Sequence, residues 1–92
     1  MIVLLSGKGK YDVTEPVEGE IILAGESLFW LLKEGTDEEF KKKLVEVHSL
    51  VVERGTPVEA LRHTDLIVPP IDSDPGFLRR VLGIDKAKKR VY

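Results

Sequence analysis

The chain of 92 residues is 42% hydrophobic and 33% charged, and its formal net charge is −2. This balance is typical of a folded globular protein, so we expect a single domain over residues 1–92 and exclude a disordered chain or a pair of catalytic domains. The chain has no cysteine, which excludes disulfides, thiolate catalysis and iron–sulfur clusters, and no apolar run reaches the roughly 18–20 residues that span a bilayer.

Amino-acid usage also indicates the habitat of the protein. The sequence contains no asparagine and no glutamine, while glutamate, lysine and arginine are abundant. Avoidance of thermolabile side chains is typical of hyperthermophiles. The apolar start, MIVLL, is too short for a signal peptide and lacks a basic flank. We therefore expect a cytoplasmic protein of a hyperthermophile.

The N-terminal residues favour extended structure. Residues 1–5 form an apolar run, residues 6–10 contain a glycine–lysine turn, and residues 11–14 favour a second short strand. The turn does not match a phosphate-binding loop, which needs the pattern G-x-x-x-x-G-K-[ST]. The sequence therefore predicts a short strand or hairpin here, and no nucleotide site.

Residues 16–34 favour one long helix. Thr14 or Glu15 is expected to cap it, with Pro16 in the first turn, where a missing amide has no cost. Two glycines in the segment leave an alternative in which Ile21–Ala24 forms a strand; we favour the helix. The apolar residues that support it recur at helical spacing: Val17, Ile21, Ala24, Leu28 and Leu31.

The flanks of this helix are also apolar. Ile22 and Phe29 lie on one flank of the stripe, and Leu23 and Trp30 lie on the other. A domain this small can cover one flank, but covering both is harder, and large apolar patches are uncommon on monomers. We therefore expect these residues to bind a partner, and a two-fold homodimer is the simplest closed solution.

The best-specified element is a helix that follows the Gly35 link. Thr36 and Glu39 have the spacing of a capping box, and Gly55 is expected to end the helix in the left-handed conformation. The short link predicts an antiparallel pair with the preceding helix. His48 lies at the edge of the apolar stripe, and we expect its ring to be partly buried and bonded to a carbonyl or a carboxylate. The stripe consists of Phe40, Leu44, Val47, His48 and Val51.

Two shorter helices are predicted after this point. Residues 56–59 repeat the capping-box pattern with proline at the first helical position, which favours a short helix ending near His63. Residues 65–68 should be extended, because a proline follows them.

The last predicted helix begins at Pro75 and is capped by one of the polar residues 72–74. Gly83 should close it, with Ile84 packing back on the final turn. Its expected buried stripe contains Phe77, Leu78, Val81 and Leu82.

Candidate catalytic and metal-binding chemistry is sparse. One imidazole and three carboxylates, His63, Asp65, Asp72 and Asp74, have side chains that bind divalent ions. Capping of the last helix explains two of these aspartates without a metal. We therefore predict no catalytic residues, no metal and no cofactor, and a small metal-assisted enzyme is the third-ranked hypothesis.

Charge is unevenly distributed along the chain. Residues 1–74 carry a formal charge of −7, and residues 75–92 carry +5. Residues 85–92 read as a basic tail or a helix extension. A basic cluster can neutralise phosphates, so a nucleic-acid accessory protein is the second hypothesis, although the acidic remainder of the chain disfavours it. The cluster comprises Arg79, Arg80, Lys86, Lys88, Lys89 and Arg90.

Together these patterns predict a mainly α fold, with two long antiparallel helices, two short helices and a short N-terminal strand or hairpin. An α+β fold is the alternative. The predicted function is that of a small non-catalytic interaction module, self-associating through Ile22, Leu23, Phe29 and Trp30 and not bound to a membrane.

Overall fold

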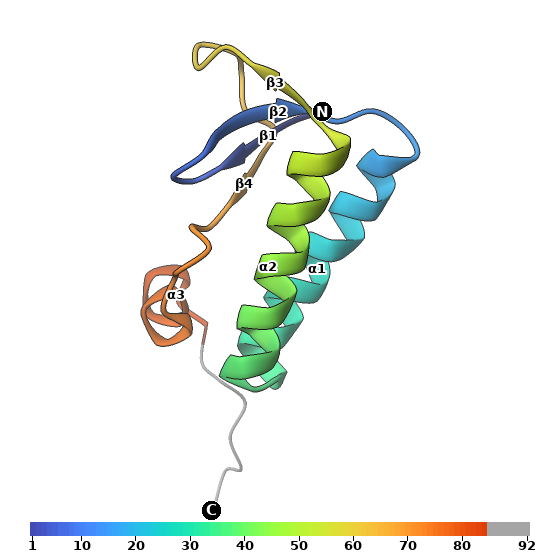
Figure 1. Cartoon of the computed structure of the whole chain (residues 1–92). Helices are drawn as coiled ribbons and strands as arrows, with labels where there is room; N and C mark the ends of the chain where they lie inside the picture. Colours follow the sequence, from blue (N-terminus) through green and yellow to red (C-terminus); the bar gives the residue numbers. More distant parts are fainter. Residues whose placement is uncertain (85–92) are drawn as a thin grey trace, which may run out of the picture.

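The structure, a computed structural model, describes residues 1–84 (Figure 1). Its sheet has the strand order β3-β2-β1-β4, with β1 antiparallel to β2 and parallel to β4. The prediction of a mainly helical fold is therefore wrong, and the fold is α+β. In chain order the elements are β1 (Ile2–Leu5), β2 (Gly9–Asp12), α1 (Val17–Glu34), α2 (Asp37–Arg54), β3 (Thr56–Val58), β4 (Leu66–Val68) and α3 (Pro75–Leu82).

Strand β3 occupies the segment that was predicted to form a short helix, so that prediction is wrong. Thr56 lies opposite Asp12 and Val58 opposite Lys10, so the segment pairs with β2, which is distant in sequence. Pro57 is tolerated because β3 is an edge strand, whose outer side has no ladder to interrupt. The segment has the capping-box pattern, but its apolar stripe is too short for a helix to be more stable than the pairing with β2.

Strand β4 confirms the prediction of extended structure at residues 65–68. It lies beside β1, although both long helices separate the two strands in sequence. Asp65 extends the pairing: its backbone N–H donates to Ile2 O at 2.8 Å, and its Oδ2 accepts from Ile2 N at 2.8 Å. Asp65 thus has a structural role: its two hydrogen bonds extend the pairing between β1 and β4.

The two long helices pack against each other and are joined only by Gly35 and Thr36 (Figure 1). The predicted capping box is confirmed: Glu39 N–H donates to Thr36 Oγ1 at 3.1 Å, and Thr36 N–H donates to Glu39 Oε1 at 2.8 Å. The predicted buried stripe of α2 is also confirmed. Helix α1 runs unbroken through Ile21–Ala24, so the alternative strand is wrong.

The start of α1 differs from the prediction. The helix begins at Val17, and Pro16 occupies the N-cap position with no side-chain hydrogen bond. Thr14 contributes its backbone carbonyl instead, which accepts from Glu18 N at 2.9 Å. The first turn of α1 is therefore capped by a backbone carbonyl, and not by the side chain of Thr14 or Glu15 as predicted.

The core runs along the whole contact between α1 and α2, and it continues onto the inner face of the sheet at the end of the helix pair where α1 begins and α2 ends (Figure 1). No helix within residues 1–84 is long and apolar enough to cross a membrane. The buried apolar residues of the core cluster are Val3, Leu5, Val13, Val17, Ile21, Ala24, Leu28, Leu32, Phe40, Leu44, Val47, Val51 and Val68.

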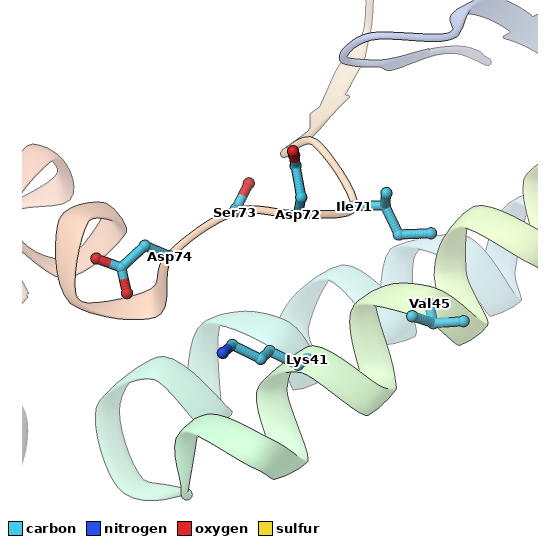
Figure 2. Close-up of a pocket in the computed structure, with 6 residues that line it drawn as sticks. All are labelled: Lys41, Val45, Ile71, Asp72, Ser73 and Asp74. Atoms are coloured by element: carbon cyan, nitrogen blue, oxygen red, sulfur yellow. The ribbon is translucent and has the colours of Figure 1, made fainter.

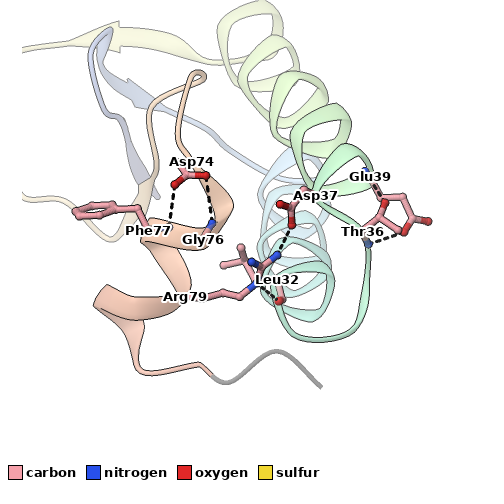
Figure 3. A network of polar contacts seen from close by, with 8 residues as sticks. All are labelled: Leu32, Thr36, Asp37, Glu39, Asp74, Gly76, Phe77 and Arg79. Carbon is pink, nitrogen blue, oxygen red and sulfur yellow. Dashed lines mark hydrogen bonds and ion pairs between the residues drawn. The ribbon is translucent and has the colours of Figure 1, made fainter. Parts of the chain in front are cut away.

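Helix α3 packs beside the other end of the helix pair. Asp74 caps it as expected, accepting from Gly76 N at 3.4 Å and Phe77 N at 3.3 Å (Figure 3). Gly83 adopts the left-handed conformation with φ 70°, and Ile84 N–H donates to Arg79 O at 2.8 Å, which confirms the predicted close.

The predicted burial of the α3 stripe is wrong. Leu78 packs against the core, but three other members, Phe77, Val81 and Leu82, are more than half exposed. The helix is held instead by Arg79, whose Nε donates to Leu32 O at 2.8 Å and whose Nη2 pairs with Asp37 (Figure 3). Arg79 thus binds a carbonyl at the end of α1 and a carboxylate at the start of α2.

Gly55 ends α2 with φ −94° and ψ 168°, so the predicted left-handed cap is wrong. Glycine is required at this position because there is no room for a side chain, and not because of the backbone conformation. A Cβ would lie 2.7 Å from Val51 O and 3.1 Å from side-chain atoms of Tyr11 and Val13. We expect Gly55→Ala to lower the free energy of unfolding by about 1–2 kcal/mol in urea denaturation.

Gly25→Ala is the matched control for this substitution. A Cβ on Gly25 would meet nothing within 4 Å, and the residue lies inside α1. Alanine there should stabilise the protein by about 0.5–1 kcal/mol, since glycine loses more backbone entropy in a helix. A Gly55→Ala variant with the same free energy of unfolding as the wild type would contradict the steric explanation.

Candidate interaction surface

Helix α1 buries one side and exposes an apolar surface on the other. Its buried residues, spaced three or four apart, pack toward α2 and the sheet. Successive residues of a helix turn by about 100°, so residues seven apart return to nearly the same direction. The buried set is Val17, Ile21, Ala24, Leu28 and Leu32, which differs from the predicted stripe only in having Leu32 in place of the half-buried Leu31.

The four residues predicted to bind a partner lie together on the opposite side of α1. The exposed fractions are 47% for Ile22, 64% for Leu23, 53% for Phe29 and 58% for Trp30. The two pairs were predicted on separate flanks of the buried stripe, but both pairs lie on the solvent side and neither is covered. We call these four residues the α1 face.

A carboxylate lies at the centre of the α1 face. Glu26 is four residues after Ile22, three after Leu23, three before Phe29 and four before Trp30. Residues three or four apart are neighbours on a helix surface, so Glu26 is adjacent to all four apolar residues. Its side chain is exposed and makes no hydrogen bond or ion pair within residues 1–84.

Two members of the basic cluster predicted to bind nucleic acid, Arg79 and Arg80, lie among the described residues, and one of them is engaged within the fold. Arg79 is committed to Leu32 and Asp37, and its side chain is only 13% exposed. Arg80 is exposed, with its guanidinium 5.9 Å from the centre of the Phe77 ring. The remaining predicted members, Lys86, Lys88, Lys89 and Arg90, lie outside the described residues, as does the predicted tail.

The predicted metal candidates do not converge. His63 is exposed beside Asp65, with 3.5 Å between Nε2 and Oδ1, while Asp65 bonds to β1 and Asp74 caps α3. Within residues 1–84 no group of three or more histidine, aspartate or glutamate side chains could hold a metal ion. Two of the aspartates, Asp65 and Asp74, therefore have a structural role that does not involve a metal.

An open hollow of about 360 Å³ lies between α2 and the segment that leads to α3 (Figure 2). Asp72 and Ser73 point away from α2, and the Ser73 hydroxyl donates to Pro70 O at 2.6 Å. Ligand sites need polar groups that converge on one point, and these do not. The hollow is lined by Lys41, Val45, Ile71, Asp72, Ser73 and Asp74.

Comparison with known proteins identifies the family of the chain. A family model described as PspA-Associated protein matches residues 1–86. No curated protein and no solved structure matches the chain. The matched range includes every helix and strand of the structure, including the α1 face.

Proposed function

The chain belongs to the PspA-Associated protein family, and we propose that it is a non-catalytic binding module that associates with PspA through the α1 face. The observation that carries the proposal is the exposure of Ile22, Leu23, Phe29 and Trp30 on one side of one helix. The family name supplies the partner, and the surface supplies the place at which it would bind.

The α1 face has the composition of an interface centre. Two of its four residues are aromatic, and aromatic side chains are enriched among the residues that dominate binding energy. Burial of their exposed surface is worth roughly 25 cal/mol per Å² before the costs of association are subtracted. Stable burial of such a patch therefore favours a partner that covers all four residues at once.

The spacing of the face fits a helical partner. Leu23 and Trp30 are seven residues apart, as are Ile22 and Phe29. A seven-residue repeat of apolar positions is the pattern by which two helices pack side by side. We therefore propose that the bound segment of PspA is a helix.

Self-association is the alternative use of the same face. The homodimer predicted from the sequence stays a prediction. Both assemblies would bury Trp30, so a test must follow the protein alone and with its partner. Trp30 is the only tryptophan of the chain, which makes it a specific reporter.

The test combines calorimetric titration with ¹⁹F NMR of the chain labelled with 5-fluorotryptophan. PspA from the same organism should shift the single fluorine resonance, and Trp30→Ala should weaken calorimetric binding at least about tenfold, because it truncates a central aromatic anchor. Leu61→Ala is the control, since Leu61 is 95% exposed but lies in the loop between β3 and β4.

The outcomes separate the two assemblies. A fluorine shift that depends on the concentration of the chain alone would favour the homodimer. Equal affinities of the wild type, Trp30→Ala and Phe29→Ala for PspA would contradict the proposed site.

A further inference from the structure

We propose that Glu26 determines which partner the α1 face accepts: it selects a helix that carries a lysine or arginine opposite it, and it disfavours a second copy of this chain. The inference rests on the proposed function, because it concerns the same surface. Its basis is the position, among four exposed apolar side chains, of a carboxylate that has no hydrogen-bond or ion-pair partner within residues 1–84.

A docked partner that covers the apolar residues must also cover the carboxylate. Ile22 and Leu23 lie on one side of Glu26 along the helix, and Phe29 and Trp30 lie on the other. Removing a charge from water is costly unless an opposite charge or hydrogen-bond donors replace the water. No cation of α1 lies three or four residues from Glu26, so the compensating group must come from the partner.

The charge around the face is mainly acidic. Besides Glu26 at its centre, the α1 face has exposed Glu20 and Glu34 at its edges and exposed Lys33 at one end, seven residues after Glu26. The first turn of α2 contains Asp37, Glu38 and Glu39, of which Asp37 is paired with Arg79 and Glu39 accepts a hydrogen bond in the capping box. Complementary potentials favour association, so this surface favours a basic partner.

Symmetry makes a second copy a poor occupant. In a two-fold dimer the same patch meets itself, and the axis passes through the centre of the contact. Glu26 is at the centre of the α1 face, so a dimer centred there brings Glu26 against Glu26, whether the helices run parallel or antiparallel. Two carboxylates facing each other in an apolar contact repel, and neither gains a donor.

Glu26→Gln removes the charge while keeping the size of the side chain. We expect this variant to bind PspA about tenfold more weakly than the wild type, with the difference shrinking as salt is added. Glu20→Gln is the matched control, because it makes the same change on the same helix but lies at the edge of the face and not at its centre, and its affinity should stay within about twofold. Far-UV circular dichroism should show equal folding, since both side chains are exposed.

The same variants test the second half of the inference without PspA. Sedimentation equilibrium should show tighter self-association of Glu26→Gln than of the wild type, because the like-charge contact is removed. If Glu26→Gln self-associates more weakly than the wild type, or with the same affinity, the inference is overturned.

The PspA titration distinguishes this inference from the proposed function. Binding that Trp30→Ala weakens but Glu26→Gln leaves unchanged would overturn the role of Glu26 and leave the binding site standing. Binding that neither substitution changes would contradict the site itself.

Discussion

Replacing Phe40 with alanine should lower the free energy of unfolding by about 3–5 kcal/mol, and replacing Leu44 should lower it by about 2–5 kcal/mol. Phe40 is 1% exposed and Leu44 is fully buried, and both belong to the core cluster between α1, α2 and the sheet. Each truncation loses the transfer free energy of the deleted atoms and leaves a cavity that the helices can only partly close. The transition midpoint in urea measures the loss.

Val45→Ala is the control on the same helix. Val45 follows Leu44 directly, but it is 46% exposed, so its truncation should change the free energy of unfolding by less than about 0.5 kcal/mol. Because a small domain has only about 5–15 kcal/mol of stability in total, Phe40→Ala is expected to remove a substantial part of it. A Leu44→Ala variant as stable as the wild type would show that α2 presents a different side to the core.

Local signals were sufficient to predict α2 and most of α1. In α2 the capping box at Thr36, the acidic first turn and the apolar stripe agree with one another. When capping, charge and hydrophobic periodicity all indicate the same helix, the helix can be predicted without knowledge of what it packs against. The same signals predicted the αL close of α3 at Gly83, which depends on a few consecutive residues.

The pairings of β3 with β2 and of β4 with β1 could not be predicted because they join segments distant in sequence, whereas β1 and β2 form the N-terminal hairpin that the sequence allows. Strand β3 has three residues and β4 has three, too few for an alternation of apolar and polar residues to be recognised. Their partners, β2 and β1, lie tens of residues earlier in the chain. The sequence analysis therefore predicted a helix from the capping-box pattern at Thr56. The strand that forms instead is stabilised by pairing with β2, which the local sequence does not reveal.

The candidate site was predicted in its residues but not in its arrangement. Ile22, Leu23, Phe29 and Trp30 were singled out as apolar residues beyond the main stripe. Helical spacing alone does not say which side of α1 the rest of the chain covers, so the two pairs were assigned to separate flanks. The central position of Glu26 becomes meaningful only when both pairs are seen to be exposed together. The role of Arg79 was missed, because its partners, Leu32 and Asp37, are far from it in sequence.

His48 is the one buried polar or charged side chain among the described residues, and its ring is 0% exposed. Its Nε2 lies 2.7 Å from Pro69 O. A carbonyl oxygen can only accept, so Nε2 must carry the hydrogen and donate it. The expected bond to a carbonyl is therefore confirmed, while the burial is more complete than expected. The bond ties the end of β4, where the chain leaves the sheet for α3, to the middle of α2.

His48→Ala should lower the free energy of unfolding by about 2–4 kcal/mol, because it combines a cavity with the loss of a partly buried hydrogen bond. His63→Ala is the matched control: the side chain of His63 is 87% exposed, so its removal should cost less than about 0.5 kcal/mol. Urea denaturation of both variants at neutral pH makes the comparison.

Two further variants separate the volume of the ring from its hydrogen bond. His48→Leu fills the space without a donor, whereas His48→Gln retains an amide N–H near the position of Nε2. Because Nδ1 is buried and has no partner among the described residues, leucine removes one unsatisfied atom but leaves Pro69 O without its donor. We expect glutamine to be the more stable of the two by about 1 kcal/mol. A His48→Leu variant as stable as the wild type would mean that the contact with Pro69 does not hold the segment between β4 and α3 against α2.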